Sequence, residues 1–147
     1  MKISTKGTYG LKAMVDLALN STNEYITLKS ISEREEISER YLEQIFSTLR
    51  KAELVKSIKG AQGGYSLGDK GMDITVGDIL RTLEGALLLS EENSDSKGVS
   101  KIDYCISTNV WRKLNNRVNE MVDSITLDNI VYEYKKINNN LNDMYYI

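Results

Sequence analysis

Residues 38–67, SERYLEQIFSTLRKAELVKSIKGAQGGYSL, pass from helical periodicity to β-branched residues and then to a cluster of glycines. Ser38 is suited to cap a helix, because its side-chain oxygen can accept from the first backbone amides. Apolar residues then recur at helical spacing, namely Tyr41, Leu42, Ile45, Phe46 and Leu49. The opposite face carries polar residues, namely Arg40, Glu43, Gln44, Ser47 and Lys51. This pattern predicts an amphipathic helix with one buried face and one face of exposed hydrogen-bonding side chains.

Two further helices are predicted upstream of this one. Residues 8–20 carry apolar side chains at helical spacing, namely Leu11, Met14, Val15 and Ala18. Thr27 can cap a short second helix, whose apolar residues are Leu28 and Ile31. The segment REEIS, residues 34–38, separates the second helix from the third. Two helices joined in this way form a helix-turn-helix, whose second helix commonly enters the major groove of DNA.

A β-hairpin is predicted directly after the third helix. Leu54, Val55 and Ile58 favour a strand, three glycines permit a tight turn, and residues 65–67 can return. Residues 50–64 hold four basic residues and one acidic residue, a net charge of +3, whereas residues 76–147 hold 8 basic and 11 acidic residues, a net charge of -3. Lysines at the turn could neutralise phosphates, and glycine amides could donate to phosphate oxygens. The hairpin is therefore predicted to be the wing of a winged helix.

A simpler interpretation exists for each of these features. A glycine-rich hairpin is often only a turn, and a polar helix face is often only solvated. Glu39 and Glu43 would also repel phosphates, unless a glutamate accepts a hydrogen bond from cytosine N4. The combination of the helix pair, the hairpin and the local positive charge favours the DNA-binding interpretation.

Three segments closely resemble a family of bacterial winged-helix repressors that includes the iron–sulfur regulator IscR and the nitric-oxide sensor NsrR. They are MKISTKGTYGL at residues 1–11, ISERYLEQIFSTLRKAELVKSIKGAQGGYSL at residues 37–67 and ITVGDILRTLEG at residues 74–85. The resemblance is dense over residues 1–85 and looser through VWRKLNNRVNEMVDSITLDNIV, residues 110–131.

The resemblance, together with the charge pattern, defines a candidate DNA-binding set. Its members are Lys2, Lys6, Ser38, Arg40, Tyr41, Glu43, Gln44, Lys56, Lys59, Gly60, Gly63 and Gly64. In the family pattern the first two lysines touch the DNA backbone, residues 38–44 lie on the recognition helix, and residues 59–64 form the wing. The chain departs from the pattern at Thr8, where an arginine is usual, and at Glu36, where glycine is common. Glu36 is expected to adopt a left-handed backbone conformation.

The second half of the chain contains a long amphipathic pattern. Apolar residues recur every three or four positions, namely Ile106, Val110, Leu114, Val118, Met121 and Ile125. Thr126 can cap a last helix through LDNIVYEY. We interpret residues 104–135 as an arm that packs against a two-fold related copy, and a helix packed in the chain's own core is the alternative.

Composition narrows the possible functions. The 147 residues contain 19 Lys and Arg and 21 Asp and Glu, a net charge of -2, so a nucleic-acid site must be a local patch. The absence of histidine removes the commonest general base and metal ligand, which disfavours an enzyme. The N-terminal segment has no apolar signal-peptide core, and no run approaches the roughly 18 apolar residues that cross a bilayer. We expect a cytoplasmic protein.

The only cysteine, Cys105, limits cluster and disulfide chemistry. The iron–sulfur members of the family carry three cysteines before the dimer helix, whereas residues 86–105 here contain one. One thiolate per chain cannot hold a cluster that normally needs four protein ligands, and a subunit-bridging cluster with carboxylate ligands is the alternative. We therefore expect no cofactor and no metal. Cys105 is a candidate redox thiol, although a buried and inert thiol is the simpler expectation.

Four apolar or aromatic residues follow a polar run at the C-terminus, namely Met144, Tyr145, Tyr146 and Ile147. A cluster-free member of the family, a repressor of cysteine-metabolism genes, has a similar wing and an aromatic tail that ends in isoleucine. Its corepressor is cysteine synthase (O-acetylserine sulfhydrylase), and serine acetyltransferase inserts a terminal isoleucine into the active site of the same enzyme. The resemblance implies that these four residues bind cysteine synthase. Packing of the tail on its own dimer, and disorder, are the alternatives.

The sequence thus predicts a mainly α fold with a small β-hairpin. Residues 1–85 form a winged helix-turn-helix DNA-binding domain, 86–103 a polar linker, 104–135 dimerisation helices and 136–147 a C-terminal tail. We expect a homodimeric repressor of cysteine and sulfur-metabolism genes that binds a pseudo-palindromic operator in double-stranded DNA. Two other classes remain: an iron–sulfur or redox-sensing regulator of the same family, and a regulator of cysteine synthase that does not bind DNA.

Overall fold

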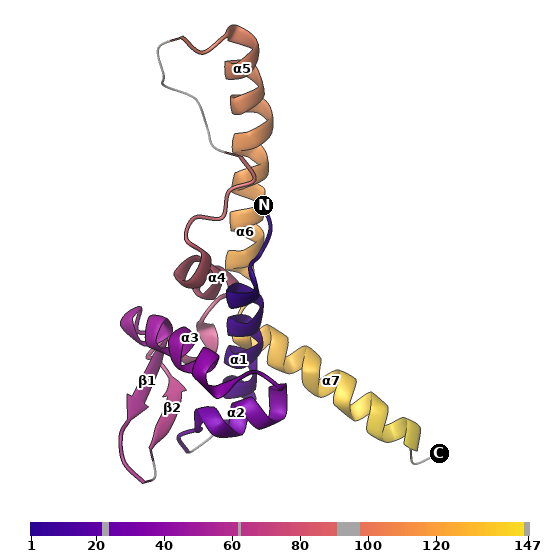
Figure 1. Ribbon diagram of the computed structural model, residues 1–147. Coiled ribbons are helices and arrows are strands. Elements are labelled where there is room, and N and C mark those ends of the chain that lie inside the picture. Colours follow the sequence, from indigo (N-terminus) through magenta and orange to yellow (C-terminus); the bar gives the residue numbers. More distant parts are fainter. Residues whose placement is uncertain (22–23, 62, 91–97, 146–147) are drawn as a thin grey trace.

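The structure is a computed structural model, which describes residues 1–21, 24–61, 63–90 and 98–145. Within these ranges it is mainly helical and contains one two-stranded antiparallel sheet (Figure 1). The predicted fold class is therefore confirmed. Among the described helices, none is both long enough and apolar enough to cross a membrane.

Three helices with serine or threonine caps build the N-terminal domain: α1 (Thr5–Asn20), α2 (Leu28–Glu35) and α3 (Glu39–Lys51). The predicted caps are confirmed, because Thr27 accepts from the Ser30 amide at 3.1 Å and Ser38 accepts from the Tyr41 amide at 3.1 Å. The first helix was predicted to begin at residue 8, and it begins at Thr5 in the structure. The reason is that Ser4 caps it by accepting from the Gly7 amide.

The turn between α2 and α3 has the conformation expected from the sequence. Glu36, the C-terminal cap residue of α2, lies in the left-handed region with φ 56° and ψ 42°. A non-glycine residue there carries backbone strain of roughly 1 kcal/mol. Its backbone turns the chain so that Ser38 can start α3 only a few residues later.

The hairpin consists of β1 (Val55–Ile58) and β2 (Gly64–Leu67), paired from Val55 with Leu67 to Ile58 with Gly64. Ile26 adds a short bridge on the other side of β2, since its amide and carbonyl bond with those of Tyr65 at 2.8 and 2.7 Å. Gly64 has φ 154°, and a side chain there would meet the Ile26 backbone carbonyl at 2.6 Å. The close approach of the Ile26 backbone therefore explains why residue 64, directly before Tyr65, is a glycine.

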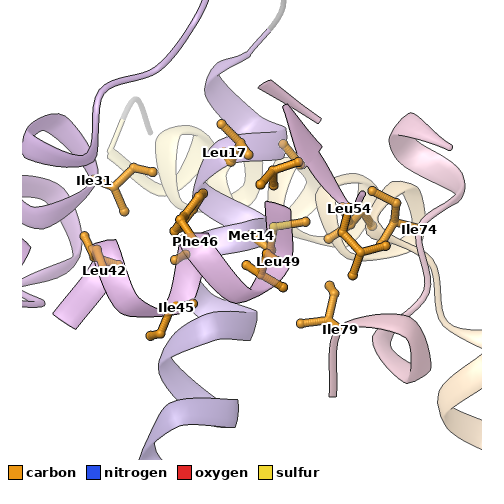
Figure 2. Packing of buried hydrophobic residues seen from close by; sticks show 14 of the residues in the cluster. Met14, Leu17, Ile31, Leu42, Ile45, Phe46, Leu49, Leu54, Ile74 and Ile79 are labelled. Atoms are coloured by element: carbon orange, nitrogen blue, oxygen red, sulfur yellow. The ribbon is translucent and has the colours of Figure 1, made fainter. Parts of the chain in front are cut away.

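One hydrophobic core joins these elements (Figure 2). Its fully buried large side chains come from α1, α2, α3, β1, the helix α4 (Val76–Glu84) with the residue Ile74 before it, and the last helix α7 (Leu127–Tyr145). They are Met14, Leu17, Ile31, Leu42, Ile45, Phe46, Leu49, Val55, Ile74, Ile79 and Leu127. Phe46 lies against Tyr65 of the hairpin, with ring centroids 4.9 Å apart. The apolar face predicted for α3 is thus the face that meets the core.

The second half of the chain begins with the short 3₁₀ helix η1 (Gly71–Asp73) and α4 (Val76–Glu84). A long helical rod then follows from α5 (Lys101–Ile106) through the π-helical turn η2 (Ser107–Trp111) to α6 (Arg112–Ser124). This rod rises beyond the N-terminal domain in Figure 1. The last helix, α7 (Leu127–Tyr145), projects from the domain in another direction.

Two boundaries differ from the sequence expectation. The rod begins at Lys101, because Ser100 caps it by accepting from the Asp103 amide at 3.0 Å. Helix α7 continues to Tyr145 instead of ending at Lys135. Its three consecutive asparagines are poor helix formers, but neither glycine nor proline interrupts the helix that starts at the Thr126 cap.

Candidate nucleic-acid interface

Helix α3 presents a polar row to solvent. Arg40, Glu43 and Gln44 are exposed, while Leu42 and Ile45 on the other side of the helix are completely buried. Anchoring by the core fixes the orientation of the helix, so the polar row points away from the domain. Arginine, glutamate and glutamine together offer donors and acceptors for the edges of base pairs.

Two residues of the candidate set at the start of α3 also stabilise the fold. The Ser38 hydroxyl oxygen is occupied as a helix cap, although its hydrogen is still available to donate. Tyr41 is half-buried and packs edge-on against Tyr9 of α1, with ring centroids 6.0 Å apart. Tyr41 therefore belongs to the packed face as well as to the rim of the polar row.

The end of α3 and the hairpin meet in a shallow groove of about 250 Å³. Ser47 and Arg50 line it from α3, and Ser57 and Lys59 line it from the hairpin. Two cations and two hydroxyls converge there, which is a chemistry suited to phosphate oxygens. The candidate set lacked Ser47, Arg50 and Ser57. Arg50 could have been included, because it belongs to the basic window at residues 50–64.

Lys56 lies on the other side of the hairpin and is paired with Asp69. The hydrogen bond between them raises the pKa of Lys56 and lowers the pKa of Asp69. Both side chains are largely exposed, so the pair is weak and can open. Because the aspartate partly cancels the lysine charge, Lys56 attracts phosphate less than Lys59 does.

The three glycines of the turn differ in their surroundings and in whether their amides are free to bind DNA. Gly60 is exposed, with φ 119°, and nothing lies near a side chain placed there. The Gly63 amide donates to the Gly60 carbonyl at 3.0 Å, so that amide is already used inside the turn. Gly64 allows the close approach of the Ile26 backbone described above. Gly63 and Gly64 thus shape the hairpin.

Lys2 and Lys6 lie away from the groove. They flank Ser4, whose backbone amide and hydroxyl both donate to Glu84 at the end of α4. The N-terminus and the hairpin tip lie at separate places in Figure 1. The structure therefore brings together α3 and the wing, and it places the two N-terminal lysines on a separate part of the surface.

The rod exposes an apolar row on one side. Its exposed members are Ile106, Val110, Leu114 and Met121, and Leu114 has 43% of its surface exposed. Val118 and Ile125 are half-buried, and Ile125 packs on a small cluster with Val76 and Leu80. Exposed apolar rows of this kind are typical of surfaces that contact other molecules.

Two other predicted residues lie on exposed helices. Cys105 is exposed, so the expectation of a buried thiol is wrong for this chain; its helix projects beyond the domain that would bury it. Met144 has 72% of its surface exposed near the end of α7. Tyr145 is helical, and Tyr146 and Ile147 lie outside the described residues.

Metal-ligating side chains do not gather in the described part of the chain. No group of three or more Asp, Glu, Cys or His residues there is arranged to hold a metal ion. The expectation of no cofactor stays a prediction, because residues 91–97 lie outside the described ranges.

Comparison with known proteins assigns the chain to a family. Residues 3–133 match the model of the Rrf2 family, described as iron-dependent transcriptional regulators. The regulator CymR of Bacillus subtilis is 44% identical over 130 residues, covering 88% of this chain and 89% of that protein. IscR of Vibrio atlanticus is 38% identical over 133 residues, covering 89% of this chain and 75% of that protein.

Solved structures agree with the sequence comparison. The structure of CymR, the global cysteine regulator of B. subtilis, superposes with a TM-score of 0.76 at 42% identity, covering 90% of this chain and 98% of that chain. The structure of T. potens IscR gives 0.75 at 44% identity, covering 93% and 90%. The predicted resemblance to the cysteine-metabolism repressor of the family is thereby confirmed. By its sequence and its fold, the chain belongs to the Rrf2 family of winged-helix transcriptional regulators.

Proposed function

We propose that the chain is a homodimeric repressor that binds a pseudo-palindromic operator through α3 and the wing. The observation that carries the proposal is the convergence of the exposed row Arg40, Glu43 and Gln44 with a groove where Arg50 and Lys59 meet. The side chains of the row can hydrogen-bond to the edges of base pairs, and the cations of the groove can bind phosphates of the DNA backbone.

Base readout by α3 is tested by replacing Glu43 or Gln44 with alanine. Each change should cost on the order of 1 to 3 kcal/mol at the cognate site, because a side chain bonded to a base edge is lost. Binding to random duplex should change little, and for Glu43→Ala it should tighten slightly because a repulsive charge disappears. Affinities for a DNA sequence selected from a random pool, and for random duplex, measure both effects. An equal loss of affinity for both duplexes would show that the replaced residue does not read a base.

Backbone contact by the wing is tested through salt dependence. If Arg50 and Lys59 of the groove, together with Lys56 and the more distant Lys2 and Lys6, neutralise about 6 to 8 phosphates in two chains, log K should fall with log salt with a slope of roughly -5 to -7. Lys59→Ala should flatten the slope by about one to two, and Lys56→Ala should flatten it less because Asp69 already screens Lys56.

Lys136→Ala is the matched control for the salt series. Lys136 lies on α7 and faces Glu133 at 3.9 Å, away from the groove. Its removal subtracts the same charge from the chain and should leave the slope unchanged. A slope that does not respond to Lys59→Ala would exclude Lys59 from the interface.

Dimerisation in this proposal uses the exposed row on the rod. The row runs along α5, η2 and α6, and three of its side chains, Ile106, Val110 and Leu114, are about 40% exposed. Burial of the remaining surface of each would stabilise an interface by a fraction of the roughly 1.5 to 3 kcal/mol that complete burial of such a side chain provides. A two-fold axis would place the same row on both sides of the contact, so each side chain counts twice.

Control by cysteine synthase is the finer part of the proposal. It is supported by the similarity to CymR, whose structure is described as that of a global cysteine regulator. It is also supported by the exposed apolar residues Ile137, Leu141 and Met144 along α7, which leave the end of this helix without cover from the described part of its own chain. Met144, at the end of this helix, is therefore accessible to a partner.

Removal of residues 144–147 should abolish capture of cysteine synthase, and Ile147→Ala should weaken it by about one to two powers of ten, the equivalent of roughly 1.5 to 3 kcal/mol of lost burial. Calorimetric titration with purified enzyme measures both. Substitution Lys135→Ala, an exposed change on the same helix, is the control. Unchanged enzyme binding after the deletion would exclude the tail from the contact.

A redox-sensing or iron–sulfur regulator is the second candidate, because Cys105 is exposed. An absorption spectrum of the anaerobically purified protein separates the cases. Visible bands of a cluster would favour the second candidate over control by cysteine synthase.

A further inference from the structure

A polar row on α6 faces the chain's own domain. Asn115, Asn119 and Asp123 recur at every fourth position, so they lie on one side of the helix. Asn115 is 2% exposed; its side chain accepts from the Leu89 amide at 2.7 Å and donates to the Ser90 carbonyl at 3.0 Å. Asn119 donates to the Leu87 carbonyl at 2.9 Å, so the two asparagines hold the segment after α4 along the rod.

Arg81 of α4 joins the same row. Its guanidinium binds both carboxylate oxygens of Asp123 at 2.7 and 2.9 Å, and it also donates to the Asn119 side-chain oxygen at 3.1 and 2.9 Å. The hydrogen bond to Asp123 raises the pKa of Arg81. Because four hydrogen bonds run from one planar guanidinium to two residues of α6, they fix the orientation of α6 relative to α4 as well as the distance between the two helices. We call Arg81, Asn119 and Asp123 the clasp.

The end of α6 is held independently. The Val76 amide donates to the Ile125 carbonyl at 2.8 Å, and the Leu127 amide donates to the Ile74 carbonyl at 2.8 Å. These bonds fix the corner between α6 and α7 to the start of α4, and Leu127 is completely buried in the core. One fixed corner leaves a helix free to tilt, whereas a second attachment along its length sets the tilt.

We propose that the clasp sets the angle at which α6 leaves the winged-helix domain, and thereby the spacing of the two half-sites in the operator. The inference rests on the proposed dimer, in which the rods join the two domains. Since α6 has 13 residues, it is about 20 Å long, and a tilt of about 10° moves its far end by roughly 3 Å, close to the rise of one base pair. Arg81, Asn119 and Asp123 are positioning residues, because they act through the rod.

The neighbouring backbone is shaped for the clasp. Gly77 of α4 is buried, and a side chain placed there would overlap the Asp123 carboxylate and approach the Arg81 guanidinium to 2.8 Å. The absence of a side chain at residue 77 therefore lets Asp123 reach Arg81 across the surface of α4. Gly77→Ala should displace Asp123 and break the ion pair while both charged residues remain.

Three variants of the full chain separate positioning from folding. Arg81→Met removes all four bonds, and Gly77→Ala displaces the pair without any change in charge. Lys70→Ala is the control. It removes a different ion pair, in which Lys70 contacts Asp78 of α4 at 3.1 Å, and this pair includes no residue of α6. The midpoint of thermal unfolding identifies any variant that loses the fold, and the second clasp variant keeps the test open if the first one unfolds.

The first measurement is the preference for half-site spacing. A duplex selected from a random pool by the wild type is remade with its half-sites one or two base pairs closer or farther apart. The wild type should discriminate against a one-base-pair change by about tenfold, and the clasp variants should reduce that discrimination to threefold or less, while Lys70→Ala retains it. A merely structural role would lower affinity equally at every spacing.

The second measurement needs no DNA. Spin labels at Lys29→Cys, on the exposed side of α2 in a Cys105→Ser background, report the distance between the two winged-helix domains of a dimer. The clasp variants should widen the distance distribution at least twofold relative to wild type and Lys70→Ala. Equal widths together with unchanged spacing discrimination would overturn the inference. A wild type that gives no interdomain distance or no selected DNA would instead overturn the proposed function.

Discussion

Replacing Leu114 by glutamate is expected to separate the dimer and to lower operator affinity by about 10² to 10⁴-fold. The side chain lies in the middle of the exposed apolar row of the rod, and a two-fold axis would bring two added carboxylates close together. Separated chains lose the effective concentration that one bound half-site provides for the other. Sedimentation equilibrium gives the mass, and titration of an operator duplex gives the affinity.

Asn116→Glu is the matched control for this prediction. It adds the same charge to the same helix, but Asn116 lies on a polar side of α6 with Lys113 and Glu120. Its mass and operator affinity should stay near the wild-type values. Because Leu114 is 43% exposed, the fold of the single chain should survive the change. A dimeric Leu114→Glu protein would place the two-fold contact on another surface.

Replacing Phe46 by alanine is expected to cost about 3 to 5 kcal/mol in the free energy of unfolding. Phe46 is completely buried, links α3 to the hairpin through Tyr65, and sits in the middle of the core (Figure 2). A domain of this size has only about 5 to 15 kcal/mol of stability, so a large fraction of it would be lost. Urea unfolding followed by far-ultraviolet circular dichroism at one fixed protein concentration measures the loss.

The exposed Ile58 provides the comparison for Phe46. Ile58→Ala on the hairpin should change the free energy of unfolding far less, by about 0.5 kcal/mol, because Ile58 is 47% exposed and lies outside the core. A loss below about 1 kcal/mol for Phe46→Ala would mean that α3 is not anchored by this residue. The orientation of the polar row on α3 would then need another explanation.

The features that could be predicted from the sequence are local ones. The Ser38 and Thr27 caps, the left-handed Glu36 and the apolar face of α3 each depend on residues within one or two turns of chain. The hairpin followed from β-branched residues and glycines in a short window. Residues close together in the chain are sufficient to form these elements. The packed core agrees with the helix faces that were predicted to be buried.

The features that could not be predicted depend on distant parts of the chain. Lys56 meets Asp69 only because the hairpin folds back, and the groove beside Arg50 exists only because Tyr65 packs on Phe46. The clasp joins Arg81 to α6 across a long separation in sequence. Residue spacing along the chain does not indicate such contacts. A polar asparagine within a helical pattern is ordinarily expected to face solvent, whereas Asn115 and Asn119 bond to the segment after α4.

In the proposed complex, two chains read two half-sites through α3 and the wing. Hydroxyl-radical footprinting of a duplex selected by the purified protein tests this claim most directly. We expect two protected segments related by two-fold symmetry, with centres about one helical turn or a multiple of it apart, and two chains per duplex. Protection of one segment by one chain, or uniform protection of every duplex without a selected sequence, would contradict the account.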